Sequence, residues 1–228
     1  MTETSHHLHG WFKDHRFLFL LIIILMVFLL HPLVEDFIRI SFILDIFISA
    51  ILLSAVYAVA DSRGTLIFAL VTALPASFAH WINWFVKIPA LHLIDVTFGA
   101  VFLGFASVII VSHLFKQKRV TADLIRGAIC GYFLIGLMWA FVYALLEILH
   151  PGSFTSGQVG ELDMNGLIYF SFVTLCTTGY GDITPLTDQA RFLAILEAVM
   201  GQMYLAVNIA ALVAIRISQS SDRNQKTT

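Results

Sequence analysis

Charged side chains are scarce in this chain, and only 12% of its 228 residues are Asp, Glu, Lys or Arg. Soluble domains typically carry about 25% charged and about 45–50% apolar residues, whereas 59% of this chain is apolar. Its mean hydropathy is +0.88. The composition therefore predicts an integral membrane protein in contact with lipid. A net charge of −2 disfavours a nucleic-acid partner.

The chain has only two cysteines and shows no signal-peptide cleavage site. Cys130 and Cys176 both lie in apolar stretches, so we expect free thiols rather than a disulfide. The first apolar run lacks a small-residue cleavage site, so we expect it to stay as an anchor. The polar stretch 218–228 is predicted to be a disordered tail, too short for a nucleotide- or calcium-binding regulatory domain.

Familiar enzyme motifs are missing as well. The sequence has no Gly-x-Ser-Gly nucleophile loop and no His-Glu-x-x-His zinc helix, so an intramembrane enzyme is a disfavoured alternative. The N-terminal histidines lack a firm metal-ligand spacing. Metal binding or a pH response stays open for them, but a solvated tail or an interfacial helix is favoured. They are His6, His7, His9 and His15.

Long apolar runs are what the chain does contain. A hydrocarbon core about 30 Å thick needs about 20 apolar residues per helix, and six runs meet that length. The predicted spans are about Phe17 to beyond His31-Pro32, Phe37–Ala60, Thr65–Phe85 (with a kink at Pro75), Ala90–Phe115, Ala122–Leu149 and Gln189–Ile217. A seventh run, Asn165–Cys176, is too short to cross and fits a helix that enters part-way. The predicted fold is therefore all-α, with six transmembrane helices and one re-entrant helix.

Basic residues predict how the spans are oriented. With six spans, both termini lie on one side, and that side carries ten of the thirteen Lys and Arg residues. Cytoplasmic loops carry an excess of these residues, so both termini are predicted to be cytoplasmic. The loop between Leu149 and Gln189 then faces outward.

A six-residue run in that outer loop carries the strongest signal. Thr177-Thr178-Gly179-Tyr180-Gly181-Asp182 follows the short apolar run that ends at Cys176. It resembles the selectivity filter of potassium channels, in which four copies of a loop line a pore with backbone carbonyls that replace the water around the ion. The resemblance covers about residues 122–217, from an outer helix through the pore helix and filter to an inner helix.

The resemblance implies a homotetrameric potassium channel of the six-transmembrane, voltage-gated-like superfamily, in the plasma membrane. Its compact build is similar to that of prokaryotic channels. Potassium is the ion implied, with no organic cofactor, and relatives that conduct sodium as well tend to lose the filter Tyr. The implied ion-binding residues are Thr177, Thr178, Gly179, Tyr180 and Gly181, with Asp182 at the outer mouth. A non-conducting regulatory subunit is the alternative.

Two departures from the family pattern concern the filter and its support. Thr178 stands where Val or Ile is usual, but its side chain is expected to face away from the ion path. Tyr169 and Phe170 stand where the family often carries two Trp that brace Tyr180. Phe170 cannot donate a hydrogen bond, so we expect it to support the filter by packing.

Three further positions are candidates for support or gating. Family members often use a Glu like Glu147 to hold the loop before the inner helix. Arg191 is a candidate partner, and an interfacial Glu in water is the alternative. Gly201, twenty-two residues after Gly179, matches a hinge glycine or a small packing residue. Asn208 either faces the pore or joins helices.

The four spans before the pore segment resemble a voltage sensor without its charges. No Lys or Arg occurs from Val96 to Phe115. Moving one charge through 100 mV supplies about 2.3 kcal/mol, and steep gating needs several charges. We therefore predict weak or absent voltage dependence. The polar residues in this region form either a sensing cluster or simple interhelical hydrogen bonds, the second being favoured. They are Asp45, His80, His92 and Asp95.

Four segments follow from these features. Residues 1–16 are a cytoplasmic segment, 17–117 a four-helix sensor-like domain, 118–217 the pore domain and 218–228 a cytoplasmic tail. The linker between the fourth and fifth spans, Lys116–Asp123, is short. We therefore expect the four-helix domain to pack beside the pore of its own subunit. The gating stimulus stays open, with the gate expected at the filter or near Gly201.

Overall fold

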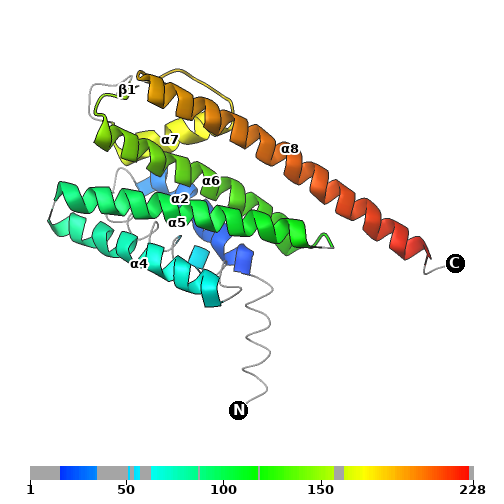
Figure 1. Cartoon of the computed structure of the whole chain (residues 1–228). Coiled ribbons are helices and arrows are strands. Elements are labelled where there is room, and N and C mark those ends of the chain that lie inside the picture. The colour runs from blue at the N-terminus through cyan, green and yellow to red at the C-terminus, as the bar shows by residue number, and fades with distance from the viewer. Residues whose placement is uncertain are drawn as a thin grey trace, which may run out of the picture.

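The computed structural model describes residues 16–34, 51, 54–56, 63–86, 88–117, 119–156 and 162–225. Within these residues, long helices dominate and one small β-ribbon is added (Figure 1). The elements are α2 (Arg16–Val34), α4 (Arg63–Phe85), α5 (Pro89–Lys116), α6 (Ala122–Leu149), β1 (Phe154–Ser156), α7 (Met164–Leu175), β2 (Ile183–Pro185) and α8 (Asp188–Gln225).

The helix bounds agree closely with the expected spans. α6 has the bounds that the sequence predicted, and α4, α5 and α7 begin and end within two residues of theirs. In the described part of the chain, four helices are long and apolar enough to cross a membrane: α4, α5, α6 and α8. The apolar stretch of α2, Phe17–Leu29, is shorter. The predicted second span, Phe37–Ala60, lies almost wholly outside the described residues, so six spans remain a prediction.

The C-terminal end of α8 corrects one expectation. The helix does not stop near Ile217 but continues to Gln225, so most of the stretch predicted as a disordered tail is helical. The physical reason is that an existing helix gains one backbone hydrogen bond for each residue added. No Gly or Pro interrupts the sequence between Ile217 and Gln225.

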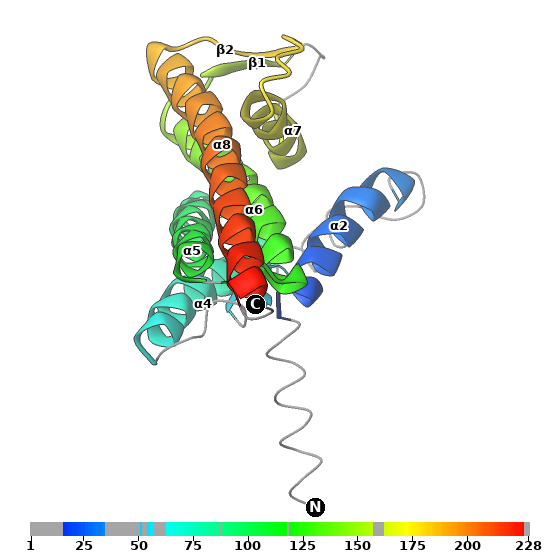
Figure 2. The same ribbon diagram turned by 90° about the vertical axis from the view of Figure 1, so that its right-hand side faces the viewer.

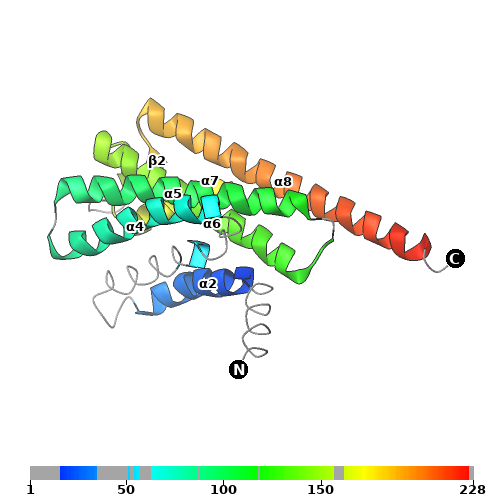
Figure 3. The same cartoon turned by 60° about the horizontal axis from the view of Figure 1, so that its bottom comes forward.

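α6 is the central helix of the molecule. α5, α2, α7 and α8 all pack against it, while α4 packs on the outer side of α5. Figure 2 places α4 and α5 on one side of α6 and α2 on the other. Consecutive long helices run antiparallel, so the start of α6 and the ends of α5 and α8 lie toward one end of the molecule (Figures 1 and 3).

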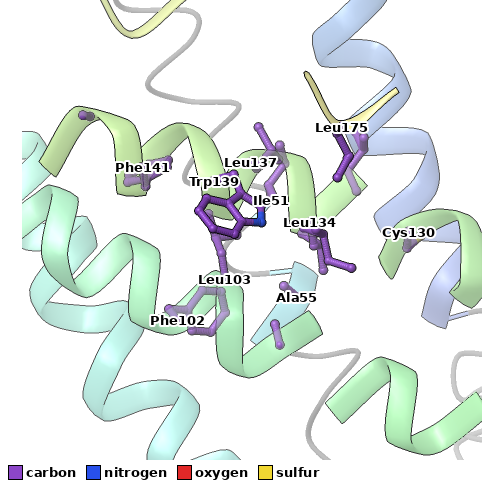
Figure 4. Packing of buried hydrophobic residues seen from close by; sticks show 14 of the residues in the cluster. Ile51, Ala55, Phe102, Leu103, Cys130, Leu134, Leu137, Trp139, Phe141 and Leu175 are labelled. Atoms are coloured by element: carbon purple, nitrogen blue, oxygen red, sulfur yellow. The ribbon is translucent and has the colours of Figure 1, made fainter. Parts of the chain in front are cut away.

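Close packing joins α5 to α6 of the same chain. Gly99 lies so near Phe141 that a Cβ atom there would come within 2.5 Å of the ring. Aromatic and aliphatic side chains from both helices, including Phe102, Leu134 and Trp139, fill the core around this contact (Figure 4). α5 therefore packs directly on α6 of the same chain.

The β-ribbon was not foreseen in an all-α fold. β1 pairs antiparallel with β2, with Thr155 opposite Thr184, and their hydroxyl oxygens lie 2.6 Å apart. Strands of three residues are too short for an alternating pattern to reveal. The ribbon fastens the turn after α6 to the segment that follows the filter.

Candidate ion-conduction site

α7 is the half-length helix that leads into the filter. The carboxylate of Asp163 caps its first turn by accepting a hydrogen bond of 2.9 Å from the Gly166 amide. Its twelve residues span about 18 Å, too little to cross a hydrocarbon core. Leu167 and Leu175 are buried against the rest of the chain. α7 is therefore anchored in the protein at both ends and delivers the chain to Thr177.

The backbone φ angle alternates in sign along the filter. Thr177, Gly179 and Gly181 have φ values of 55°, 60° and 79°, whereas the residues between them stay at negative φ. Such alternation turns successive N–H groups to one side and successive carbonyls to the other. The amides of Thr178 and Gly179 point to the Val173 carbonyl, at 2.9 and 3.4 Å. The carbonyl side of the loop therefore faces away from α7.

Thr177 adopts this left-handed conformation without being a glycine. That conformation costs an L-residue roughly 1–2 kcal/mol. Such strain persists only where surrounding contacts impose it. Here the Thr177 amide donates to the Thr174 carbonyl at 2.9 Å, and Gln202 of α8 lies 3.4 Å from the Thr177 hydroxyl.

The outer end of the filter is held by Tyr169. Its hydroxyl donates a hydrogen bond of 2.7 Å to Oδ2 of Asp182, and this bond holds the pKa of Asp182 below its ordinary value. The Tyr180 ring lies nearly parallel to the Tyr169 ring, at an interplanar angle of 7° and 6.5 Å between centroids. Tyr180 is nevertheless 72% exposed in the single chain.

Phe170 packs α7 against the outer helix and the β-ribbon. Its buried ring meets Tyr143 and Phe154 edge-on, with centroids 5.1 and 5.2 Å apart. Tyr132 of α6 holds the end of α7, because its hydroxyl lies 3.3 Å from the Leu175 carbonyl. The expected support by packing is thus directed at the outer helix and the β-ribbon.

Glu147 holds the turn that follows α6. Its carboxylate accepts hydrogen bonds from the amides of Gly152 and Ser153, at 2.6 and 3.0 Å. The Ser153 carbonyl in turn accepts from the Leu186 amide just before α8, at 2.8 Å. The candidate pair with Arg191 is not formed, since Arg191 pairs with Asp188 at 3.7 Å.

Gly201 and Asn208 both contact the protein interior. A Cβ atom at Gly201 would collide with the carbonyl oxygen of Leu175. This position therefore permits the close approach of α8 to the end of α7. Asn208 is buried and donates a hydrogen bond of 2.8 Å to the carbonyl of Tyr204 in its own helix. Its side chain therefore does not lie on the exposed faces of α8.

The polar residues of the first helices are only partly brought together. Nδ1 of His80 in α4 lies 2.9 Å from Oδ2 of Asp95 in α5, which forms an interhelical pair. His92 is exposed. Asp45 and the N-terminal histidines lie outside the described residues. In the described part of the chain, no three His, Cys, Asp or Glu side chains gather closely enough to hold a metal ion.

Sequence reasoning missed a buried carboxyl in α8. Glu197 is fully buried, with its oxygens 2.5 Å from the hydroxyls of Tyr143 in α6 and Ser171 in α7. The signal was visible, since Glu197 is a lone ionisable residue within a long apolar run, and such residues are functional candidates by default.

A family described as "Ion channel" matches residues 129–217, from within α6 through the filter to α8. Two pore potassium channel c of Oryza sativa is 38% identical over 64 residues, which cover 28% of this chain and 14% of that protein. Two-pore potassium channel 5 of Arabidopsis thaliana is 30% identical over 98 residues, covering 43% and 22%. No solved structure matches the chain.

A shorter bacterial protein matches over nearly its whole length. Protein LctB of Bacillus caldotenax is 29% identical over 120 residues, which cover 50% of this chain and 89% of that protein. The chain spans only about a quarter or less of the plant channels that it matches. The chain is thus similar to ion channels over the segment from α6 to α8, and its apolar helices support a multi-pass membrane protein.

Proposed function

We propose that this protein is a potassium-selective channel whose ion path is lined by the carbonyls of Thr177 to Gly181. The observation that carries this proposal is the alternating backbone of the filter, with positive φ at every second residue. Because the amides of Thr178 and Gly179 are engaged by Val173, the carbonyls are free to face an ion. Rings of such carbonyls replace the hydration shell of potassium.

Four chains are proposed to assemble around the filter. A single chain supplies only one side of the ion path, and its Tyr180 and much of α8 are exposed. Ile195 and Ile209, two apolar residues of α8, are each 60% exposed. Neighbouring copies of α7 and α8 would cover these side chains. The homotetramer therefore supplies both the missing carbonyls and the missing contacts.

The proposed orientation places the filter at the outer face of the plasma membrane. Arg63, Lys116 and Arg126 lie at helix ends of one side, opposite Asp188 and the β-ribbon. An excess of basic residues marks the cytoplasmic side. Both termini are then cytoplasmic.

Conduction is proposed to depend weakly or not at all on voltage. α5 occupies the position of a sensor helix, yet it contains no Lys or Arg before Lys116. Without charges to move, the first helices cannot couple the membrane potential to an opening step. The filter and the α7–α8 contact at Gly201 are the proposed seats of the gate.

Purified protein reconstituted in planar bilayers tests the proposal. With potassium on one side and sodium on the other, we expect single-channel currents that reverse near the potassium equilibrium potential and that barium blocks. The variant Gly179→Ala places a Cβ at a positive φ and should abolish the current. Reversal near zero would overturn potassium selectivity. Absence of current from a correctly assembled tetramer would favour the non-conducting regulatory subunit.

A further inference from the structure

A buried polar cluster joins the three helices of the pore segment behind the filter. It consists of Glu197 on α8, Tyr143 and Gly136 on α6, and Ser171 on α7. Two atoms of the Glu197 carboxyl lie 2.5 Å from partners: Oε2 from the Tyr143 hydroxyl and Oε1 from the Ser171 hydroxyl. The Ser171 hydroxyl also lies 2.7 Å from the Gly136 carbonyl. No ion path residue belongs to this cluster.

The number of hydrogens in the cluster decides its protonation state. Three short contacts need three hydrogens, but the Tyr143 and Ser171 hydroxyls supply only one each, and the Gly136 carbonyl supplies none. If Ser171 donates to Gly136, the third hydrogen must lie on Oε1 of Glu197 and point to Ser171. Tyr143 then donates to Oε2, and every contact contains one hydrogen.

The surroundings of Glu197 agree with a neutral acid. The side chain is fully buried, and in the described part of the chain no Lys or Arg forms an ion pair with it. An unpaired buried carboxylate carries a desolvation penalty of several kcal/mol. A carboxylic acid with both oxygens hydrogen-bonded avoids that penalty.

The cluster is connected to the filter through α7. Ser171 lies two residues before Val173 on α7. The Val173 carbonyl accepts hydrogen bonds from the Thr178 and Gly179 amides. One turn after Glu197 on α8, Gly201 lies directly against the Leu175 carbonyl at the end of α7. Any shift of α7 relative to α6 and α8 would therefore move the filter backbone.

We propose that Glu197 is a positioning residue, held as a neutral carboxylic acid, that fastens α7 to α6 and so sets the position of the filter. This inference rests on the proposed potassium conduction for its effect on selectivity. It does not rest on conduction for the state of Glu197 itself. The cluster acts on the ions only through α7.

Variants of the full-length protein separate this role from a general contribution to stability. Glutamine matches a neutral acid, because it offers one acceptor oxygen and a donor at the same positions. We expect Glu197→Gln to keep the wild-type potassium-to-sodium permeability ratio and to unfold within about 2 °C of wild type. Glu197→Ala should lower the unfolding temperature by about 4–8 °C and reduce the permeability ratio. Asp188→Asn, at an exposed position of the same helix, is the matched control and should change neither.

Infrared spectroscopy of the purified protein at neutral pH tests the protonation state without any current. Wild type should show a carboxylic-acid carbonyl stretch that Glu197→Gln removes and Asp188→Asn leaves. Absence of that band, or a Glu197→Gln variant as unstable as Glu197→Ala, would overturn the neutral acid. An unchanged permeability ratio in Glu197→Ala would overturn the positioning role. If wild type carried no current, the proposed function would fail, while the infrared and unfolding results would still decide the state of Glu197.

Discussion

The Tyr169 hydroxyl and the Asp182 carboxylate are joined by a hydrogen bond of 2.7 Å across the outer end of the filter. The bond links α7 to the last residue of the Thr177–Asp182 loop, thirteen positions later in the chain. The ring of Tyr169 also stacks on Tyr180. One side chain therefore holds two filter residues by two different interactions.

Removing only the hydroxyl separates these two interactions. In Tyr169→Phe the ring stays and the hydrogen bond to Asp182 is lost. We expect channels that still open but whose current decays faster, because the outer filter is held less firmly. Long single-channel recordings in potassium solution measure how fast the current decays. An unchanged decay rate would show that the bond does not hold the filter open.

Acid should weaken the same bond, and the sign follows from the pKa of Asp182. That pKa is lowered in the folded protein, first by the hydrogen bond from Tyr169. The stabilising contribution is therefore complete above the ordinary carboxyl range, near pH 4, and is lost as the pH falls through the lowered value. We expect the current to resist external acid down to about pH 4. Tyr169→Phe lacks the bond from the start, so its current should not show this acid-dependent loss. Superimposable titration curves for the two proteins would contradict this.

A methyl group at Gly201 should disrupt the contact between α7 and α8. In Gly201→Ala the new Cβ collides with the Leu175 carbonyl, which belongs to backbone and cannot rotate away. Overpacking of this kind typically costs about 1–3 kcal/mol, so we expect lower thermal stability and loss of conduction. Gly104→Ala is the matched control, because its Cβ would lie 3.6 Å from the flexible Met138 side chain. Equal stability of the two variants would argue against close packing at Gly201.

Loss of the Glu147 carboxylate should loosen the turn after α6. Glu147→Ala leaves the Gly152 and Ser153 amides without their acceptor. Hydrogen bonds to a charged group are worth about 1.5–3 kcal/mol each, less where solvent reaches them, so we expect destabilisation of about 1–3 kcal/mol. Thermal unfolding of the purified protein measures it. Arg191→Ala should have a much smaller effect, because Arg191 contacts the exposed Asp188. A larger effect of Arg191→Ala would favour a role for that side chain instead.

In the segment from α6 to α8, local sequence patterns predict several features of the structure. The bounds of α6 and the half-length of α7 follow from runs of apolar residues, because a membrane helix must satisfy every backbone group within itself. Gly179 and Gly181 could be assigned to strained torsions because glycine tolerates them. The Thr177 torsion was not predictable, since neighbouring contacts impose it.

Contacts between distant segments were beyond sequence reasoning. The β-ribbon joins residues 29 positions apart, and each strand is too short to carry a pattern. The polar composition after Ile217 favours disorder, but α8 propagates through it to Gln225.

The sequence by itself determined that this is a membrane protein with a filter-like loop, because hydrophobic length and glycine position act locally. Only the tertiary structure decided which partners hold that loop. It brought Glu197 to Ser171 and Tyr143, directed Glu147 to backbone amides instead of Arg191, and placed Gly201 against Leu175. Such pairings depend on how whole helices pack, and helix packing is set by side-chain volumes on several elements at once.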